Sequence, residues 1–225
     1  MGAEFGAFGK MPSLGDFFRV DIDRGFVTAW DHWLQDSMAD AKLRLDSRWD
    51  DCYMNAPIWR FSLSAGLAGD KKAMGILMPS VDRVGRQFPL TLMCNMDTRG
   101  PILRDHFLNN SVLTAAENLA LDALDDSMTR DRLAENLGNL PPMAQQMAGN
   151  ARYLAGSMIV TGGDAKALLP DLAAEGTATQ FATPSIWTTV VAGEARMMIC
   201  EKMPDKIQAL GLFDLTAPIW LAGVS

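Results

Sequence analysis

Residues 58–96 read IWRFSLSAGLAGDKKAMGILMPSVDRVGRQFPLTLMCNM, and their pattern predicts three consecutive strands. Residues 58–63 alternate apolar and polar side chains, which is typical of a half-buried strand. Further strands are predicted over residues 73–78 and 88–96, separated by a turn at residues 66–70 and a polar loop at residues 79–87. Because these connections are short, the three strands are expected to form an antiparallel meander.

Other elements are predicted on both sides of the meander. Residues 5–10 form a short strand, and from Asp23 to Leu45 apolar side chains recur every three to four positions, as in a helix. Pro101 opens one long helix, residues 130–137 form a second, and Pro170 is expected to bend or end a third over residues 165–174. A hairpin over residues 186–201 and a short helix after Pro204 follow. The pattern that would indicate a helix or a strand is weakest over residues 143–163.

This order of elements predicts an α/β fold of the α+β kind. We expect a mixed, largely antiparallel sheet with flanking helices and a core like that of profilin or longin domains. The length of 225 residues fits a single domain over residues 1–225. Its motif-rich core is expected over residues 1–130, and a helical and β-hairpin elaboration over residues 131–225.

Composition narrows the classes of partner. The chain has 20 Lys and Arg against 27 Asp and Glu, a net charge of −7, which argues against nucleic acid as a partner. No apolar stretch approaches the ~18 residues of a spanning helix, so no membrane insertion is expected. Three widely spaced cysteines without a CxxC pair, and a start without a signal-like pattern, favour a reduced, cytoplasmic location.

A search for catalytic motifs finds none. Gly9-Lys10 lacks the earlier glycine and the following Ser or Thr of a phosphate-binding loop. No GxSxG segment is present. The two histidines, His32 and His106, are isolated in sequence and are expected to be structural. We therefore predict no enzyme activity and no catalytic, cofactor-binding or metal-ligating residue.

Two polar segments stand out, each beside a predicted strand end: GKMPSLGDF at residues 9–17 and PSVDRVGRQFP at residues 79–89. The candidate cluster that they form comprises Lys10, Ser13, Asp16, Ser80, Asp82, Arg83 and Arg86. Because its cations can form charge-assisted bonds with Asp16 and Asp82, the two loops are expected to be adjacent in space. Arg86→Ala is then expected to destabilise the fold or to weaken partner binding.

Three interpretations of this cluster stay open. The ion pairs stabilise the fold alone, or they shape a polar surface that a partner recognises, or they serve a hydrolase. The hydrolase would use the cluster formed by Lys10, Ser13, Asp16, Ser80, Asp82 and Arg86. A deep pocket with an activated Ser or Lys would favour the enzyme, whereas ion-paired loops without a cavity would favour binding.

The same segments carry a resemblance to a known family. The motif GKMPSLGDF, then WDHWLQ at residues 30–35, APIWRFSL at residues 56–63 and PSVDRVGRQFPL at residues 79–90 resemble, in order and spacing, the type VI secretion-associated family TagF, also called ImpM. Weaker likeness continues at residues 184–187 and 211–213.

The resemblance implies a cytoplasmic accessory protein of a bacterial type VI secretion system. Members of the family are associated with post-translational repression of secretion and with the forkhead-associated scaffold protein of the apparatus. The expected partners are therefore type VI secretion components, and the expected action is protein binding. A structural assembly factor is the further alternative. The family supplies no established catalytic residues.

The sequence does not single out the partner surface. Trp59, Trp187 and Trp220 are candidate anchors because each lies in a strand-like or terminal segment. If all three are buried, the interface is expected on the polar loops or at the acidic helix end formed by Asp125 and Asp126. Because the chain is acidic overall, a basic patch is expected on its partner, and partner binding is expected to weaken as salt rises.

Overall fold

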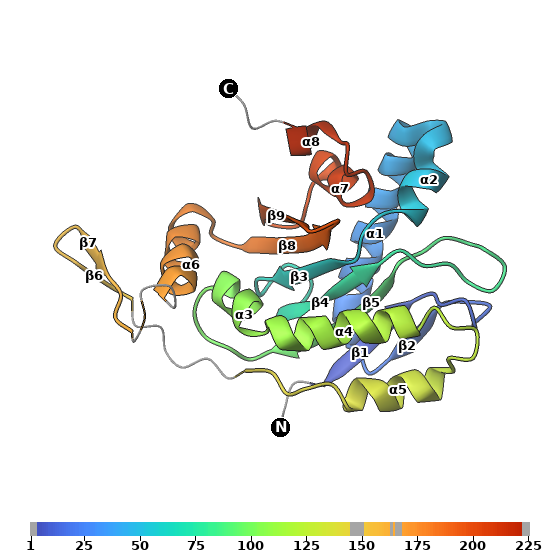
Figure 1. Ribbon diagram of the computed structural model, residues 1–225, viewed down its shortest axis with the longest axis horizontal. Helices are drawn as coiled ribbons and strands as arrows, with labels where there is room; N and C mark the ends of the chain where they lie inside the picture. Colours follow the sequence, from blue (N-terminus) through green and yellow to red (C-terminus); the bar gives the residue numbers. More distant parts are fainter. Residues whose placement is uncertain (1–3, 145–150, 163, 165–167, 222–225) are drawn as a thin grey trace.

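One antiparallel sheet organises the chain (Figure 1). The computed structural model describes residues 4–144, 151–162, 164 and 168–221. The strands are β1 (Phe5–Gly9), β2 (Phe18–Val20), β3 (Trp59–Leu63), β4 (Lys72–Met78), β5 (Leu90–Met96), β8 (Pro184–Val191) and β9 (Glu194–Glu201), in the spatial order β2-β1-β5-β4-β3-β8-β9. The predicted meander β3-β4-β5 is confirmed, as is the predicted hairpin, which joins β8 to β9.

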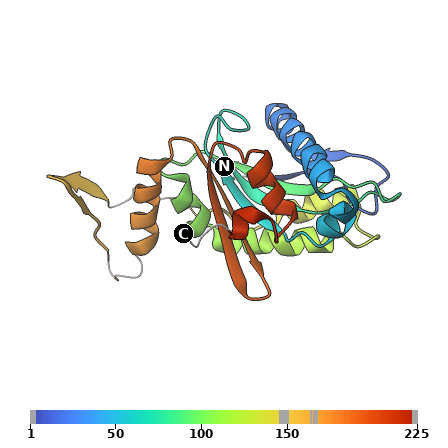
Figure 2. The ribbon, with the colours of Figure 1, turned by 90° about the horizontal axis from the view of Figure 1, so that it is seen from above.

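Helices cover both faces of this sheet (Figures 1 and 2). They are α1 (Arg24–Leu45), α2 (Trp49–Met54), which follows a 3₁₀ turn at Asp46–Arg48, α3 (Ile102–Leu108), α4 (Asn110–Asp122), α5 (Arg130–Gly138), α6 (Leu169–Gln180), α7 (Lys206–Phe213) and α8 (Pro218–Leu221). A separate two-stranded hairpin joins β6 (Arg152–Leu154) to β7 (Ser157–Ile159). The predicted α+β fold, a largely antiparallel sheet with flanking helices, is confirmed.

Two apolar layers result from the period of two along the strands. Met74, Ile76 and Leu92 pack with α3, α4 and α5, whereas Trp59 and Phe61 face the layer that contains α1 and α7. Burying both faces of the central strands provides the main driving force for this arrangement.

Helix α1 begins where the side chain of Asp23 accepts hydrogen bonds from the backbone N–H groups of Gly25 and Phe26. Its buried Trp30 packs against Phe61, and the indole Nε1–H donates to Thr91 Oγ1 at 2.9 Å. This hydrogen bond satisfies the polar end of an otherwise apolar, buried side chain.

Two helix predictions are wrong in detail. The single helix after Pro101 is broken at Asn109, whose amide Nδ2 donates to Asp105 O at 2.9 Å while its Oδ1 accepts from the N–H of Ala144. Pro170 does not bend or end a helix. It lies in the first turn of α6, where its missing N–H costs nothing, and the helix runs on to Gln180. Residues 165–167 of that prediction lie outside the described residues.

Helix α6 is fixed to α3 by ion pairs. Arg104, almost fully buried, contacts Asp171 at 2.5 Å and Glu175 at 3.2 Å.

Among the described helices, none combines the length and the apolar character that crossing a membrane requires.

Candidate functional site

The sheet topology brings the two polar loops to the same end of the sheet. β1 runs antiparallel to β5, with Phe8 opposite Thr91, so the end of β1 lies beside the start of β5. Residues 10–17 follow β1 and residues 79–89 precede β5; we call these two segments together the two-loop site. The backbone N–H of Arg83 donates to Leu14 O at 2.8 Å. The predicted adjacency of the loops is confirmed.

Asp82 is the centre of the two-loop site. Its buried carboxylate contacts Lys10 Nζ at 3.0 Å and Arg86 Nε at 2.6 Å through Oδ2. Its Oδ1 accepts from the backbone N–H groups of Val84 and Arg86, at 3.1 and 2.9 Å. The guanidinium of Arg86 also donates to Gly15 O at 2.6 Å, which ties the second loop to the first.

These contacts keep Asp82 ionised. Burial alone would raise the pKa of its carboxyl. The backbone N–H of Arg86, the Lys10 ammonium and the Arg86 guanidinium outweigh that effect and hold the pKa of Asp82 well below its usual range. The buried charge is therefore matched, as a buried carboxylate requires.

The two loops can lie together because Gly9 lets the backbone at Pro89 come close to the backbone at the end of β1. Gly9 has φ +131°, and a Cβ there would lie 2.1 Å from Pro89 O, at the end of the second loop. Only glycine fits this position, because both the dihedral angle and the available space exclude a side chain.

Aromatic rings cover one side of the ion pair. Lys10 Nζ lies 4.8 Å from the centroid of the Phe17 ring. Phe17 in turn meets Phe88 edge to face at 4.7 Å, and Phe88 meets Phe8 at 5.8 Å. Phe17 remains 46% exposed, so the aromatic group reaches the surface.

Helix α2 braces the second loop, a contact that the sequence analysis missed. The Tyr53 hydroxyl donates to Ser80 O at 2.7 Å and accepts from the Ser80 N–H at 3.1 Å. Trp49 Nε1–H donates to Gln87 Oε1 at 2.5 Å. The spacing of four residues between Trp49 and Tyr53 fits one helix face, but a single such pair is too short a pattern to predict a helix.

Several of the candidate residues do not behave as predicted. Asp16 and Arg83 form no ion pair with any described residue; Asp16 Oδ1 instead accepts from the backbone N–H of Phe17. Within the described chain, neither Ser13 Oγ nor Ser80 Oγ has a hydrogen-bond partner, although both atoms are buried. The predicted pairing of the cations with Asp82 therefore holds for Lys10 and Arg86, and the predicted pairing with Asp16 is wrong.

The outer surface of the site combines charge with apolar groups. Asp16, Phe17, Arg83, Val84 and Arg86 are exposed, and Val84 is 70% exposed. The backbone beneath them is fixed by the bonds of Asp82. A rigid surface with Arg, aromatic and aliphatic groups is the kind that protein partners recognise.

The other candidate residues lie elsewhere. Trp59 and Trp187 are buried, and Trp220 is half-buried. His106 is buried between Ser62 Oγ and Thr188 Oγ1, each 2.8 Å from a ring nitrogen, whereas His32 is exposed beside Asp36. The three cysteines are free, and no group of metal-ligating side chains gathers among the described residues.

Comparison with known proteins identifies the family. A sequence profile described as "TagF N-terminal domain, Type VI secretion system-associated" matches residues 6–140, more than half of the chain. This chain belongs to the TagF family. The match includes both segments of the two-loop site, and the resemblance drawn from their motifs is confirmed. A TagF chain has an accessory role in type VI secretion.

A solved structure shows the same TagF fold. The chain is similar to the crystal structure of PA0076 from Pseudomonas aeruginosa PAO1, with a TM-score of 0.75 and 25% identity over 93% of each chain. No curated protein gives a significant sequence match.

Proposed function

We propose that this TagF protein acts in the cytoplasm as a post-translational repressor of type VI secretion, by binding a component of the apparatus through the two-loop site. The forkhead-associated scaffold protein is the proposed partner. The observation that carries the proposal is the two-loop site itself, where a buried, charge-matched Asp82 fixes an exposed surface of Phe17, Arg83, Val84 and Arg86.

The chemistry of the cluster supports binding over catalysis. A serine nucleophile needs an adjacent base, and neither Ser13 Oγ nor Ser80 Oγ has a hydrogen-bond partner among the described residues. A lysine nucleophile must be neutral, whereas Lys10 is almost fully buried against the ionised Asp82. Lys10, Asp82 and Arg86 hold the two loops together through their mutual contacts.

The exposed charges of the two-loop site indicate which charge its partner should present. The exposed ionic groups of the site are Arg83, Arg86 and Asp16, which leaves one net positive charge on a chain whose total is −7. The facing surface of the partner is therefore expected to be acidic around an apolar centre, which replaces the basic patch expected from the total charge of the chain. Such rim charges mainly accelerate association, so binding weakens as salt rises.

The direct test is binding between the purified chain and the purified scaffold protein of the same secretion system, at low and at high salt. The proposal predicts a complex with wild-type chain at low salt and weaker binding at high salt. Absence of a complex at both salt concentrations would overturn the proposed partner.

A repressor and a structural assembly factor differ in the cell. Deleting the gene for a repressor raises secretion, whereas deleting an assembly factor lowers it. Secretion that stays unchanged on deletion would count against both.

A further inference from the structure

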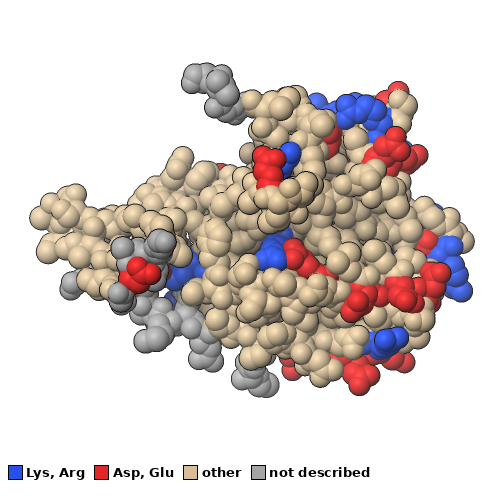
Figure 3. Space-filling model, in the orientation of Figure 1, with Lys and Arg blue, Asp and Glu red and all other residues tan. Residues whose placement is uncertain are grey.

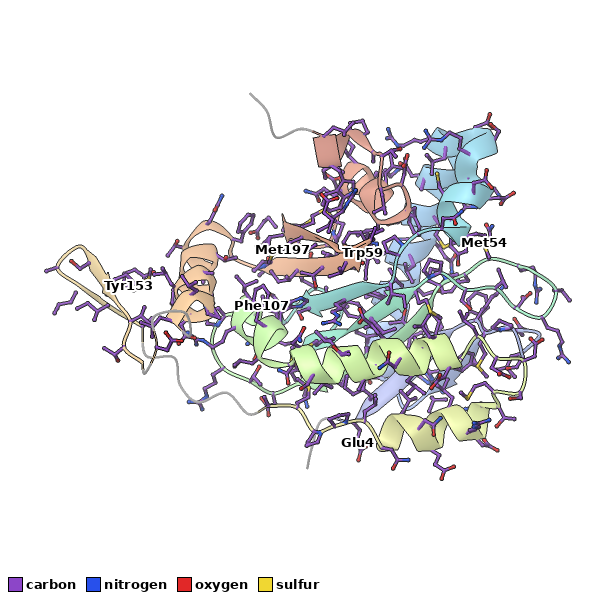
Figure 4. The ribbon with its side chains drawn as sticks, viewed as in Figure 1. Glu4, Met54, Trp59, Phe107, Tyr153 and Met197 are labelled. Atoms are coloured by element: carbon purple, nitrogen blue, oxygen red, sulfur yellow. The ribbon has the colours of Figure 1, made fainter. Side chains whose placement is uncertain are left out.

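An open groove lies on the face of the sheet that carries α3 and α4, and it is distinct from the two-loop site. The groove encloses about 900 Å³ between these helices and the β8–β9 hairpin. Its apolar walls are Phe107 and Leu121 on the helices and Val190 and Met197 on the strands, which are between 40% and 69% exposed. Figure 4 labels Phe107 and Met197 on the two sides. Exposed apolar side chains gathered around one hollow mark an interaction site.

The charged groups of the groove already have partners, although of its two arginines only Arg60 pairs with a carboxylate. Arg60 donates to both carboxylate oxygens of Glu117, and its Nη1 donates to Asn110 Oδ1 at 2.6 Å. Arg196 turns its guanidinium to the Leu215 carbonyl and to the Trp220 ring. A neutral occupant would therefore leave no ionic group without its partner.

A second apolar feature projects from the same chain. Figures 1 and 2 both show the β6–β7 hairpin extending beyond α6 and away from the sheet. We call residues 153–162 the arm; Arg152, the first residue of β6, lies at its base. Tyr153 and Leu154 are 58% and 67% exposed. Residues 153–162 contain no Asp, Glu, Lys or Arg, and the arm forms an uncharged projection in Figure 3.

The arm belongs to a regular antiparallel hairpin that projects from the rest of the molecule. Ala155 and Gly156 both have positive φ, as in the tight turns that join two strands directly. An isolated two-stranded hairpin is at best marginally stable in water, and it gains stability by packing an apolar face on another surface. Figure 4 shows Tyr153 far from Phe107 and Met197 of its own chain.

We infer that the arm of one copy of this chain docks in the groove of a second copy, and that the exchange is reciprocal. An arm without ionic groups suits a groove in which Arg60 pairs with Glu117 and Arg196 already contacts a carbonyl and an aromatic ring, and each feature supplies the apolar contact that the other lacks. Reciprocal contact gives a closed, two-fold dimer with two identical interfaces. This inference does not depend on the proposed repression of secretion.

The test is sedimentation of the purified chain over a concentration series, with one variant in each feature. Leu154→Asp alters the arm and Val190→Asp alters the groove; Leu43→Asp is the matched control, because Leu43 is 82% exposed on α1, on the other face of the sheet. Wild type and control are expected to dimerise. Each variant is expected to raise the dimer Kd by about 100-fold or more, because its dimer buries two unpaired carboxylates.

Mixing the two variants identifies the contact. Leu154→Asp chains keep an intact groove and Val190→Asp chains keep an intact arm, so the mixture contains one complete contact per mixed dimer. We expect heterodimers in the mixture at concentrations where each variant alone is monomeric. A monomeric wild type, variants that dimerise like the control, or a mixture without heterodimers would each overturn the inference. The milder Tyr153→Ser and Val190→Ser replace any variant whose thermal unfolding shows a damaged fold.

Discussion

Lys10 Nζ lies 3.0 Å from Asp82 Oδ2 in a buried ion pair that joins two loops 72 residues apart. This pair lies on the buried side of the two-loop site, whereas the Arg86 guanidinium contacts the same carboxylate from the solvent side. The two cations differ in burial, since the side chain of Lys10 is 6% exposed and that of Arg86 is 57% exposed. They are therefore expected to contribute unequally to stability.

Lys10→Met is expected to lower the free energy of unfolding by about 3 kcal/mol, because it leaves a buried carboxylate without its buried partner. Arg86→Ala is expected to cost only about 1 kcal/mol, because Lys10 still faces Asp82 and the largely exposed Arg86 guanidinium is screened by solvent. Urea unfolding of both variants checks the ranking. Equal losses would show that burial does not decide the strength of these pairs.

Gly9→Ala tests the close approach of the two loops. The new Cβ would clash with Pro89 O, and the alanine would have to keep a φ of +131°. We therefore expect the free energy of unfolding to fall by more than about 2 kcal/mol. Gly66→Ala is the control, because Gly66 also has positive φ, +91°, but a Cβ added there would meet no atom within 4 Å. Thermal unfolding should show the larger loss for Gly9→Ala; similar losses would mean that the contact with Pro89 is not tight.

The fold could be predicted from local patterns to a large extent. Alternation along Trp59–Leu63 and the turn chemistry after it indicate the meander without any tertiary information. The pairing of Arg60 with Thr188 could not be found in this way, because nothing local links β3 to a strand so distant in sequence. Helix α2 was missed because six residues are too few to show a period.

The site was predicted in its position but not in all its contacts. Charge matching placed the loops together, but it could not choose between Asp16 and Asp82 as the acceptor, since both lie in polar loops. The choice depends on burial and on the backbone N–H groups of Val84 and Arg86, which converge on Asp82. Such convergence is a property of the folded loop.

Acid should destabilise the fold through His106. Burial, with a smaller effect of Arg60, lowers the pKa of this imidazole from 6.5 to about 4. Between these two values the unfolded chain binds a proton that the folded chain does not. The stabilisation is complete above about pH 6.5 and is lost as the pH falls towards 4, in total about 3 kcal/mol.

The measurement is the free energy of unfolding from pH 7 to pH 4 for wild type and for His106→Gln. Glutamine carries no titratable group, so the variant should lose the part of the pH dependence that His106 causes. Identical pH profiles would show that His106 is not the group responsible.

Arg83→Glu tests the exposed surface of the site without changing its buried ion pairs. Arg83 forms no ion pair with a described residue, so stability should change by less than about 0.5 kcal/mol. Association with the scaffold protein should become slower and less sensitive to salt. Lys71→Glu, the same change of charge just before β4 and therefore at the opposite end of that strand, is the control, and it should bind like wild type in surface-based kinetics. Equal effects of both variants would place the partner elsewhere.

Repression through the two-loop site can be measured directly as secretion by a strain that lacks the gene and carries either wild type, Val84→Asp or the control Leu43→Asp at equal abundance. Val84 is 70% exposed on the outer surface of the two-loop site, and Leu43 is 82% exposed on α1. Repression through the two-loop site predicts that deletion raises type VI secretion, that wild type and Leu43→Asp restore repression, and that Val84→Asp does not. Unchanged secretion on deletion, or full repression by Val84→Asp, would contradict it.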